Sequence, residues 1–223
     1  MQEFSEEYID KGTEAGPKKG GDFDMDRKSR SRGLINYAEC YDLLYQAGYA
    51  EAHEISHGIS SGLAEVCSKL VGIDTVLDIG CAGGSLLRYF QQKEKQVTGI
   101  DCSAVAVQLA HDQGAHAITA SATDLPFSDN SFDLVFSSET FEHLEPVHAD
   151  AAISEACRVS KKYVAMQIAT QIDRAHWKKI VGHDLHLSCF PILYWRDKFI
   201  KASKGTQIFG SGNRFIIEIN LLG

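Results

Sequence analysis

The stretch "VLDIGCAGG", Val76 to Gly84, decides the fold of this 223-residue chain. A short apolar strand runs into a turn with three glycines, and the helical pattern "SLLRYFQQKEK" follows directly. Glycines let the backbone turn sharply here and approach a ligand without interference from a Cβ atom. In an open α/β sheet, a glycine-rich turn after the first strand is a common ligand site. The dinucleotide-binding spacing G-x-G-x-x-G is not satisfied, because its second glycine position holds Ala82.

Strands and helices alternate along the chain after this turn. Strand patterns cover "QVTGID" (96–101), "HAITASA" (116–122), "SFDLVFSS" (131–138) and "KKYVAMQIAT" (161–170), while 103–115 and 148–160 have helical periodicity. Two β-rich runs then surround Gly210–Asn213, which is typical of a hairpin. This order predicts an α/β fold with a Rossmann-like, doubly wound, mostly parallel sheet. We expect a C-terminal antiparallel hairpin and an N-terminal helical cap in addition.

The chain divides into three predicted parts. The expected boundaries are 1–33 for a disordered leader, 34–72 for the helical cap and 73–223 for the domain that contains the sheet. The leader is polar, contains glycines and mixes both charges, and such a composition does not bury enough apolar surface to fold.

Tyrosines recur at intervals of four in the predicted cap, and on a helix they share one stripe. They are Tyr37, Tyr41, Tyr45 and Tyr49, with Gly48 as the expected helix break. A second helix is expected over 50–70. The tyrosine stripe either packs on the sheet or, through Tyr37, Tyr41 and Tyr45 together with His57, forms a lid over a ligand.

Composition and charge argue against several classes of protein. The net charge of −8 disfavours a broad nucleic-acid-binding face. No apolar run is long enough to span a membrane, and the first residues lack the layout of a secretory signal. The six cysteines are scattered without a C-x-x-C pair, which indicates reduced thiols and a cytoplasmic location. No metal ligand set is assigned, and no motif indicates an oligomeric state.

A second motif follows in "VTGIDCS". Asp101 ends the second predicted strand, and a carboxylate at that position can accept hydrogen bonds from two vicinal ribose hydroxyls. The alternative role for Asp101 is to cap the following helix, for which Ser103 is also suited. A third motif is "ASATDLPFSDNSFDLVFSSETFEHL", residues 120–144, with a Leu-Pro-Phe turn before a strand and an acidic, aromatic and histidine-containing segment after it.

These three motifs, in this order and spacing, resemble those of class I S-adenosylmethionine-dependent methyltransferases. The closest group is the ubiquinone/menaquinone-methyltransferase-like branch that modifies small molecules, and the resemblance covers about residues 74–170. It implies an enzyme that binds S-adenosyl-L-methionine, releases S-adenosyl-L-homocysteine and methylates a small-molecule acceptor.

The resemblance also assigns roles to positions of this chain. Asp78, Gly80, Cys81 and Ala82 would line the methionine end of the cofactor, Asp101 would hold the ribose hydroxyls with Cys102 beside the adenine, Ala122 and Thr123 would flank the adenine, and Ser138 and Glu139 would face the sulfonium. The chain departs from the family pattern at two positions. Ala82 replaces a usual glycine, and Ser121 stands where an acidic residue commonly contacts the adenine amine.

Histidines supply the candidate bases for the acceptor. His143 lies in "FEHLE", and His183 and His186 lie in "GHDLHLS". Imidazoles titrate near neutral pH, so a hydroxyl oxygen is the first choice of acceptor atom. Each histidine also has a purely structural alternative, and metal binding is a further alternative for His183 and His186.

Three alternatives to O-methylation stay open. Glu139 and Glu142 are compatible with N-methylation of a small amine. The departures at Ala82 and Ser121 are compatible with a protein that binds the cofactor without transferring a methyl group. His53-Glu54-Ile55-Ser56-His57 matches the H-E-x-x-H pattern of zinc hydrolases. It lacks the metzincin continuation, with Ser60 and Leu63 at the glycine and histidine positions, so this alternative is the least favoured.

Overall fold

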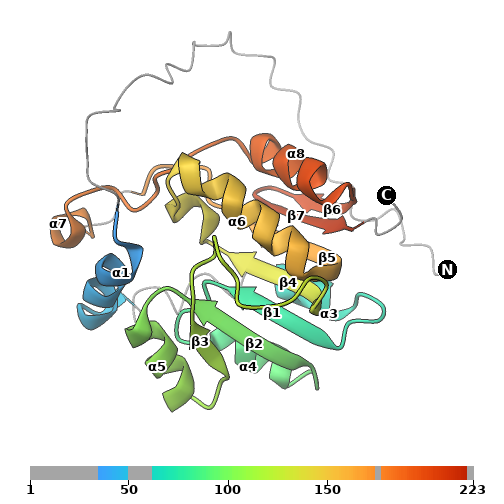
Figure 1. Ribbon diagram of the computed structural model, residues 1–223, viewed down its shortest axis with the longest axis horizontal. Coiled ribbons are helices and arrows are strands. Elements are labelled where there is room, and N and C mark those ends of the chain that lie inside the picture. The colour runs from blue at the N-terminus through green and yellow to red at the C-terminus, as the bar shows by residue number, and fades with distance from the viewer. Residues whose placement is uncertain (1–34, 50–61, 174–176, 220–223) are drawn as a thin grey trace, which may run out of the picture. The chain divides into compact units, whose positions relative to one another are not determined.

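A mixed seven-stranded sheet forms the centre of the computed structural model (Figure 1), which describes residues 35–49, 62–173 and 177–219. The strands are β1 (Thr75–Ile79), β2 (Gln96–Asp101), β3 (Ala117–Thr119), β4 (Phe132–Ser138), β5 (Ser160–Gln167), β6 (Thr206–Ser211) and β7 (Arg214–Glu218). Their order is β3-β2-β1-β4-β5-β7-β6, with β1 to β5 parallel and β7 antiparallel to both its neighbours. This confirms the predicted Rossmann-like α/β fold.

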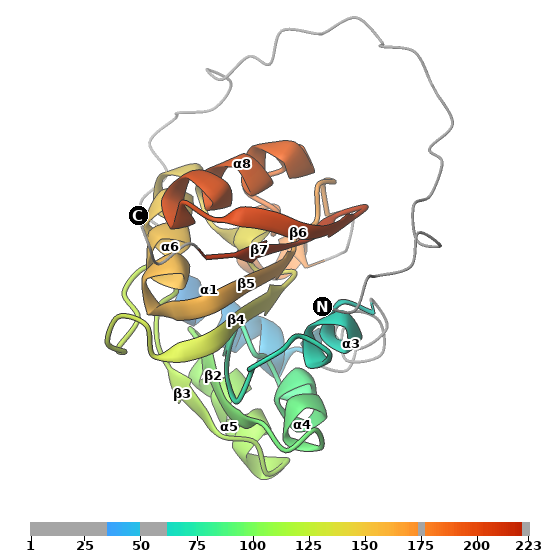
Figure 2. The same ribbon diagram turned by 90° about the vertical axis from the view of Figure 1, so that its right-hand side faces the viewer.

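Helices cover both faces of the sheet (Figure 2). They are α1 (Tyr37–Gln46), α3 (Leu63–Ser68), α4 (Ser85–Gln91), α5 (Ala104–Asp112), α6 (Pro146–Val159), α7 (Lys178–Val181) and α8 (Ile192–Ser203), with a 3₁₀ turn η2 (Phe141–His143). Helices α6 and α8 pack on one face, against Leu77 and Val135. Helices α3, α4 and α5 pack on the other, against Val76 and Phe136. Neighbouring residues of one strand therefore enter opposite cores, which explains why β1 and β4 are apolar almost throughout.

The direction in which strands are added changes between β1 and β4. From β1 the sheet extends through β2 to β3 on one side, and then through β4 to β5 on the other. In open α/β sheets, ligands usually bind beyond the carboxyl ends of the strands at such a switch point, which here is the end of the sheet formed by the carboxyl ends of β1, β2 and β4. Asp78 pairs with Gly99 of β2 and Phe136 of β4, which places it at this switch point.

The C-terminal hairpin is confirmed and inserts β7 beside β5. Its turn is shorter than predicted, because Gly210 and Ser211 belong to β6 and only Gly212 and Asn213 connect the strands. Gly212 has φ +58°, the left-handed conformation that two-residue hairpin turns require.

The third strand is also shorter than predicted. It was expected over 116–122 and ends at Thr119. The Ser121 hydroxyl accepts a hydrogen bond from the Thr123 amide at 3.2 Å, and Ser121 pairs with Asp124 across a tight turn. This local side-chain bond competes with the strand ladder and ends it.

Helix α1 confirms part of the tyrosine stripe. Tyr45 and Tyr49 are buried, and the Tyr49 ring meets Trp177 edge to face with centroids 5.1 Å apart. Gly48, with φ +89°, follows the end of α1 as predicted. A second helix was predicted over 50–70, and its described part contains α3. Residues 50–61, which include the H-E-x-x-H pattern and His57, lie outside the described residues. The predicted leader, 1–33, also lies outside them.

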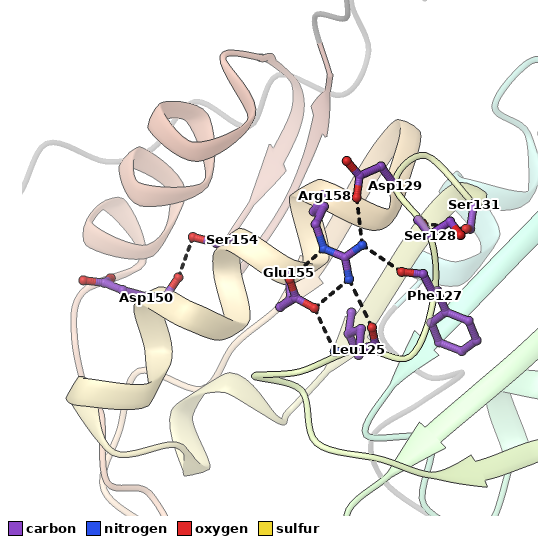
Figure 3. Close-up of polar contacts among 9 residues, drawn as sticks. All are labelled: Leu125, Phe127, Ser128, Asp129, Ser131, Asp150, Ser154, Glu155 and Arg158. Carbon is purple, nitrogen blue, oxygen red and sulfur yellow. Dashed lines mark hydrogen bonds and ion pairs between the residues drawn. The ribbon is translucent and has the colours of Figure 1, made fainter.

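Arg158 anchors the loop before β4 to α6 (Figure 3). Its guanidinium donates to the main-chain oxygens of Leu125 at 3.1 Å and Phe127 at 2.7 Å, and to the carboxylate of Asp129 at 2.9 Å. It also pairs with Glu155, which accepts a hydrogen bond from the Leu125 amide at 2.8 Å. This network fixes the path of the loop that precedes β4.

Candidate functional site

The glycine-rich turn after β1 packs between β2 and the segment after β4. The amides of Gly80 and Cys81 both donate to the Ile100 carbonyl, at 2.8 and 2.9 Å. Gly80 has φ +78°, and a Cβ atom there would lie 2.2 Å from the Thr140 hydroxyl oxygen. Only glycine fits this position, so the main chain at Gly80 packs directly against the Thr140 side chain.

Ala82 adopts the left-handed conformation, with φ +49°. A Cβ atom makes that conformation costly by about 1–2 kcal/mol. This cost explains why glycine is usual at this position in the family that the sequence resembles. The Ala82 amide donates to a carboxylate oxygen of Asp101 at 3.1 Å. This bond holds the turn against the end of β2.

Asp101 lies at the tip of β2 and is 7% exposed. Its second oxygen accepts a hydrogen bond from the Ser103 amide at 2.9 Å. Burial raises the pKa of Asp101 above its usual value. The hydrogen bonds from the Ser103 and Ala82 amides lower the pKa but do not outweigh the effect of burial. A carboxylate can accept about four hydrogen bonds, so the two amides and the Cys102 thiol, which also lowers the pKa of Asp101, leave acceptor capacity for one further donor.

Asp78 lies at the carboxyl end of β1 and is 2% exposed. Burial, together with the nearby charge of Asp101, raises its pKa to about 8. Its Oδ2 atom is buried and has no hydrogen-bond partner among the described residues. A buried carboxyl oxygen without a partner is costly, and a cationic or hydrogen-bonding ligand would remove that cost.

Asp42 joins helix α1 to the start of α5. One carboxylate oxygen accepts from the Ser103 hydroxyl at 2.6 Å and from the Val105 amide at 3.2 Å. Ser103 in turn accepts from the Ala106 amide at 3.1 Å, which confirms it as the N-cap of α5. Sequence reasoning missed Asp42, because nothing local marks a partner 61 residues away.

The end of β4 carries two polar side chains that the sequence singled out. Ser138 is half-buried, and its hydroxyl has no partner among the described residues. Glu139 has φ +56° and accepts a hydrogen bond from the Gln167 amide group at 2.9 Å. A non-glycine residue held in this conformation is uncommon and occurs more often at functional sites than elsewhere.

Beyond β4, one carboxylate and two imidazoles come together, and we name them the Glu–His–His group: Glu142, His143 and His186. Tyr41 of α1 reaches into this region, with its hydroxyl 2.7 Å from His143 Nδ1. Burial, and then the charge of Glu139, raises the pKa of Glu142 to about 8. Sequence reasoning named both histidines but gave no role to Glu142 in this group.

The remaining candidates occupy different places. His183 lies outside the Glu–His–His group; its Nδ1 bonds to the Asp184 carbonyl at 2.8 Å, and its Nε2 lies 3.8 Å from the Cys40 thiol. The Tyr37 hydroxyl accepts from the Glu145 amide at 2.8 Å and lies 3.0 Å from His148. Partly exposed candidates that follow β2 and β3 are Cys102, Ala122 and Thr123.

Comparison with known families fits this geometry. Residues 77–165, from β1 to β5, match a family described as a methyltransferase domain. The chain carries a class I methyltransferase domain. The match spans the motifs from which the resemblance was inferred, including the glycine-rich turn, Asp101 and the segment after β4.

Curated relatives agree with the methyltransferase domain. An uncharacterised methyltransferase of Synechocystis is 35% identical over 88 residues, covering 39% of this chain and 42% of that protein. A ubiquinone biosynthesis O-methyltransferase of Paracidovorax citrulli is 31% identical over 163 residues, covering 66% of this chain and 64% of that protein. The chain spans less than half the length of the first of these relatives and under two thirds of the second.

Solved structures share the fold of the methyltransferase domain. The 1,6-didemethyltoxoflavin-N1-methyltransferase of Burkholderia thailandensis, with bound 1,6-didemethyltoxoflavin and S-adenosylhomocysteine, superposes with a TM-score of 0.65 and 13% identity. The alignment covers 86% of this chain and 93% of that one. Within the described residues, no helix is both long and apolar enough to cross a membrane.

Proposed function

We propose that this chain transfers a methyl group from S-adenosyl-L-methionine to a hydroxyl oxygen of a small molecule. The observation that carries the proposal is the buried carboxylate of Asp101 at the tip of β2, held by the amides of Ala82 and Ser103 with acceptor capacity left for a ribose hydroxyl. The matched methyltransferase family and the methyltransferases among the relatives support the same activity.

The residues at the carboxyl edge of the sheet fit this cofactor. Asp78 offers a buried oxygen without a partner, which suits the ammonium group of the methionine part. Gly80, Cys81 and Ala82 would contact that part through their main chain, since the Cys81 side chain is buried in the core. The adenine would lie near three residues that follow β2 and β3, namely Cys102, Ala122 and Thr123.

A cationic ligand would stabilise the charged form of the carboxyl groups at this site, because burial raises the pKa of Asp78 to about 8 and disfavours its ionisation. Carboxyl groups at the ends of β1, β2 and β4 come from Asp78, Asp101 and Glu139. A sulfonium centre supplies a methyl group that is already activated toward nucleophiles, so the protein has to position the acceptor and take up its proton. Ser138 and Glu139 would face the sulfonium, and the bond from Gln167 would keep the Glu139 carboxylate in place.

The acceptor side is proposed to lie at the Glu–His–His group. His143 is the first candidate to take the hydroxyl proton, because the Tyr41 hydroxyl fixes the direction of its ring at 2.7 Å. His186 stands perpendicular to His143, with ring centroids 4.8 Å apart. His183 becomes the weaker candidate, since both its ring nitrogens face other groups. The O-methyltransferase among the relatives supports oxygen as the acceptor atom.

N-methylation is the second candidate. The carboxyl groups of Glu139 and Glu142 lie close enough for the charge of one to raise the pKa of the other. A pair of this kind suits an amine or ammonium acceptor. Trials with paired hydroxyl and amine acceptors of one ring system would separate the two reactions.

Calorimetric titration with S-adenosylhomocysteine tests the proposal. We expect wild-type protein to bind, and Asp101→Ala to bind at least about tenfold more weakly, which corresponds to about 1.4 kcal/mol. Asp101→Asn keeps the volume and should weaken binding in the same direction. Asp74→Ala, an exposed carboxylate before the amino end of β1, is the matched control and should bind normally. Absence of binding to wild-type protein would refute the proposal.

A further inference from the structure

The Glu–His–His group has a composition that the methyl-transfer proposal does not require. Glu142, His143 and His186 each bring a donor atom to within 4.8 Å of the others, and within the described ranges no second set of three such residues is found. Glu142 and His143 belong to η2, whereas His186 comes from the segment after α7. We propose that this group binds a divalent first-row transition metal ion, with Zn²⁺ as the reference case.

The orientation of His186 fits a metal ligand. Its Nδ1 lies 2.6 Å from the main-chain oxygen of Gln171. A carbonyl oxygen only accepts, so Nδ1 carries the proton and Nε2 presents its lone pair. Metal-bound histidines commonly donate their other ring N–H to a carbonyl or another acceptor in this way.

His143 is oriented by a different element. Its Nδ1 faces the Tyr41 hydroxyl of α1 at 2.7 Å. Tyr41 would accept from Nδ1 in the metal-bound state, because its oxygen can serve as donor or acceptor. The two imidazoles are thus held by partners that lie outside the group, one from main chain and one from a side chain.

Glu142 supplies an unsatisfied oxygen and holds the third ligand in place. Its side chain is fully buried; one oxygen accepts from the Ala169 amide at 2.9 Å, and the other has no partner among the described residues. Its main-chain oxygen accepts from the amides of Leu187 and Ser188, at 2.8 and 2.9 Å. The segment that carries His186 is therefore tied to Glu142 before any ion binds.

The donor set selects the class of ion. Two imidazoles and one carboxylate suit Zn²⁺, Co²⁺ and related ions, whereas Mg²⁺ and Ca²⁺ prefer oxygen ligands. Ligand bonds of about 2.0–2.2 Å require the three donors to draw closer together than the 4.8 Å limit, through small side-chain rotations. Three protein ligands leave a position open, where the acceptor hydroxyl would bind and lose its proton more readily. With the ion bound, His143 would be a ligand and not the base; this role of the ion rests on the proposed function, whereas the binding of the ion does not.

Metal titration of the chelator-treated full chain tests the inference. We expect one Zn²⁺ or Co²⁺ per chain, a Co²⁺ visible spectrum without a thiolate band, and no comparable binding of Mg²⁺. His186→Ala and the volume-conserving Glu142→Gln should each weaken binding by about a hundredfold or more, since losing even an outer partner of a ligand costs about 10–100-fold. His116→Ala removes an exposed histidine before β3 and should leave binding unchanged.

A second variant separates this site from the other metal-like pattern in the sequence. The double variant His53→Ala/His57→Ala should bind Zn²⁺ like the wild type. Loss of binding in that variant with retention in His186→Ala would overturn the inference, as would a wild type that takes up no transition metal. Titration with S-adenosylhomocysteine on the same samples distinguishes the proposals: cofactor binding without metal refutes only the metal site, and metal without cofactor refutes only the methyl transfer.

Discussion

At the scale of single residues, Gly80 is constrained both by its backbone conformation and by its surroundings. It combines a left-handed backbone with a Cβ position 2.2 Å from the Thr140 hydroxyl oxygen. Gly114 provides a matched comparison, because it has φ +79° and nothing within 4 Å of its Cβ position. The two glycines therefore separate the cost of backbone conformation from the cost of steric overlap.

Gly80→Ala is expected to lower the free energy of unfolding by more than about 2 kcal/mol. Gly114→Ala should lose only the conformational part, about 1 kcal/mol. Urea unfolding followed by circular dichroism measures both values. Equal losses in the two variants would show that Thr140 moves aside at no cost.

At the scale of elements, Arg158 joins α6 to the loop before β4. Its bonds run to two main-chain oxygens and two carboxylates, and the side chain is 31% exposed. Arg196 is 32% exposed, and among the described residues its ion pair is with its chain neighbour Asp197. The comparison separates a network that includes main chain from a local surface pair.

Arg158→Ala should destabilise the protein by about 1–2 kcal/mol after allowance for solvent screening. Arg158→Lys should recover little of this, since an ammonium group does not reproduce the planar fork of donors. For Arg196→Ala we expect a change below about 0.5 kcal/mol. Thermal unfolding of the three variants measures these differences, and similar midpoints for Arg158→Ala and Arg196→Ala would count against the network.

At the scale of the whole molecule, Asp78 makes stability depend on pH. Its pKa is about 8 in the folded chain, against an ordinary value of 3.8, because burial and the charge of Asp101 disfavour ionisation. Between these values the native state binds more protons than the unfolded state, so stability falls as pH rises. The contribution is fully present below about pH 4 and is lost as pH passes about 8.

Asp78→Asn should therefore reduce the loss of stability between pH 6 and pH 9. The measurement is the free energy of unfolding from urea titrations at both pH values, in the wild type and in the variant. The quantity to compare is the change in unfolding free energy with pH in the wild type minus that in the variant, since the other titrating groups contribute the same pH dependence to both proteins. Identical pH dependence would show that Asp78 ionises normally in the native state.

The sequence allowed prediction of the features that are local or periodic. The alternating strands, the turn at Gly80, the N-cap at Ser103 and the C-terminal hairpin are each encoded within a short stretch. The placement of Asp101 at the tip of β2 follows from the same local patterns. The assigned contacts of the candidate site residues with cofactor and acceptor remain predictions.

The features that escaped prediction depend on side chains far apart in the chain. Asp42 meets the start of α5, and Glu142 gathers with His186, because the folded sheet brings their elements to one edge. No periodicity encodes such a pair. The early end of β3 was missed for a different reason, since Ser121 bonds to Thr123 in competition with the ladder.

Helix α1 has a consequence for how the chain folds. Its ten residues are too few to form a stable helix alone, and its described side-chain hydrogen bonds to other elements reach residues 61 to 143 positions away. Contacts of such high contact order carry a large loop-closure cost and form slowly. The segment synthesised before the sheet is therefore expected to dock only after the sheet exists, so that a nascent chain completes the edge at the carboxyl ends of its strands as one of its last folding events.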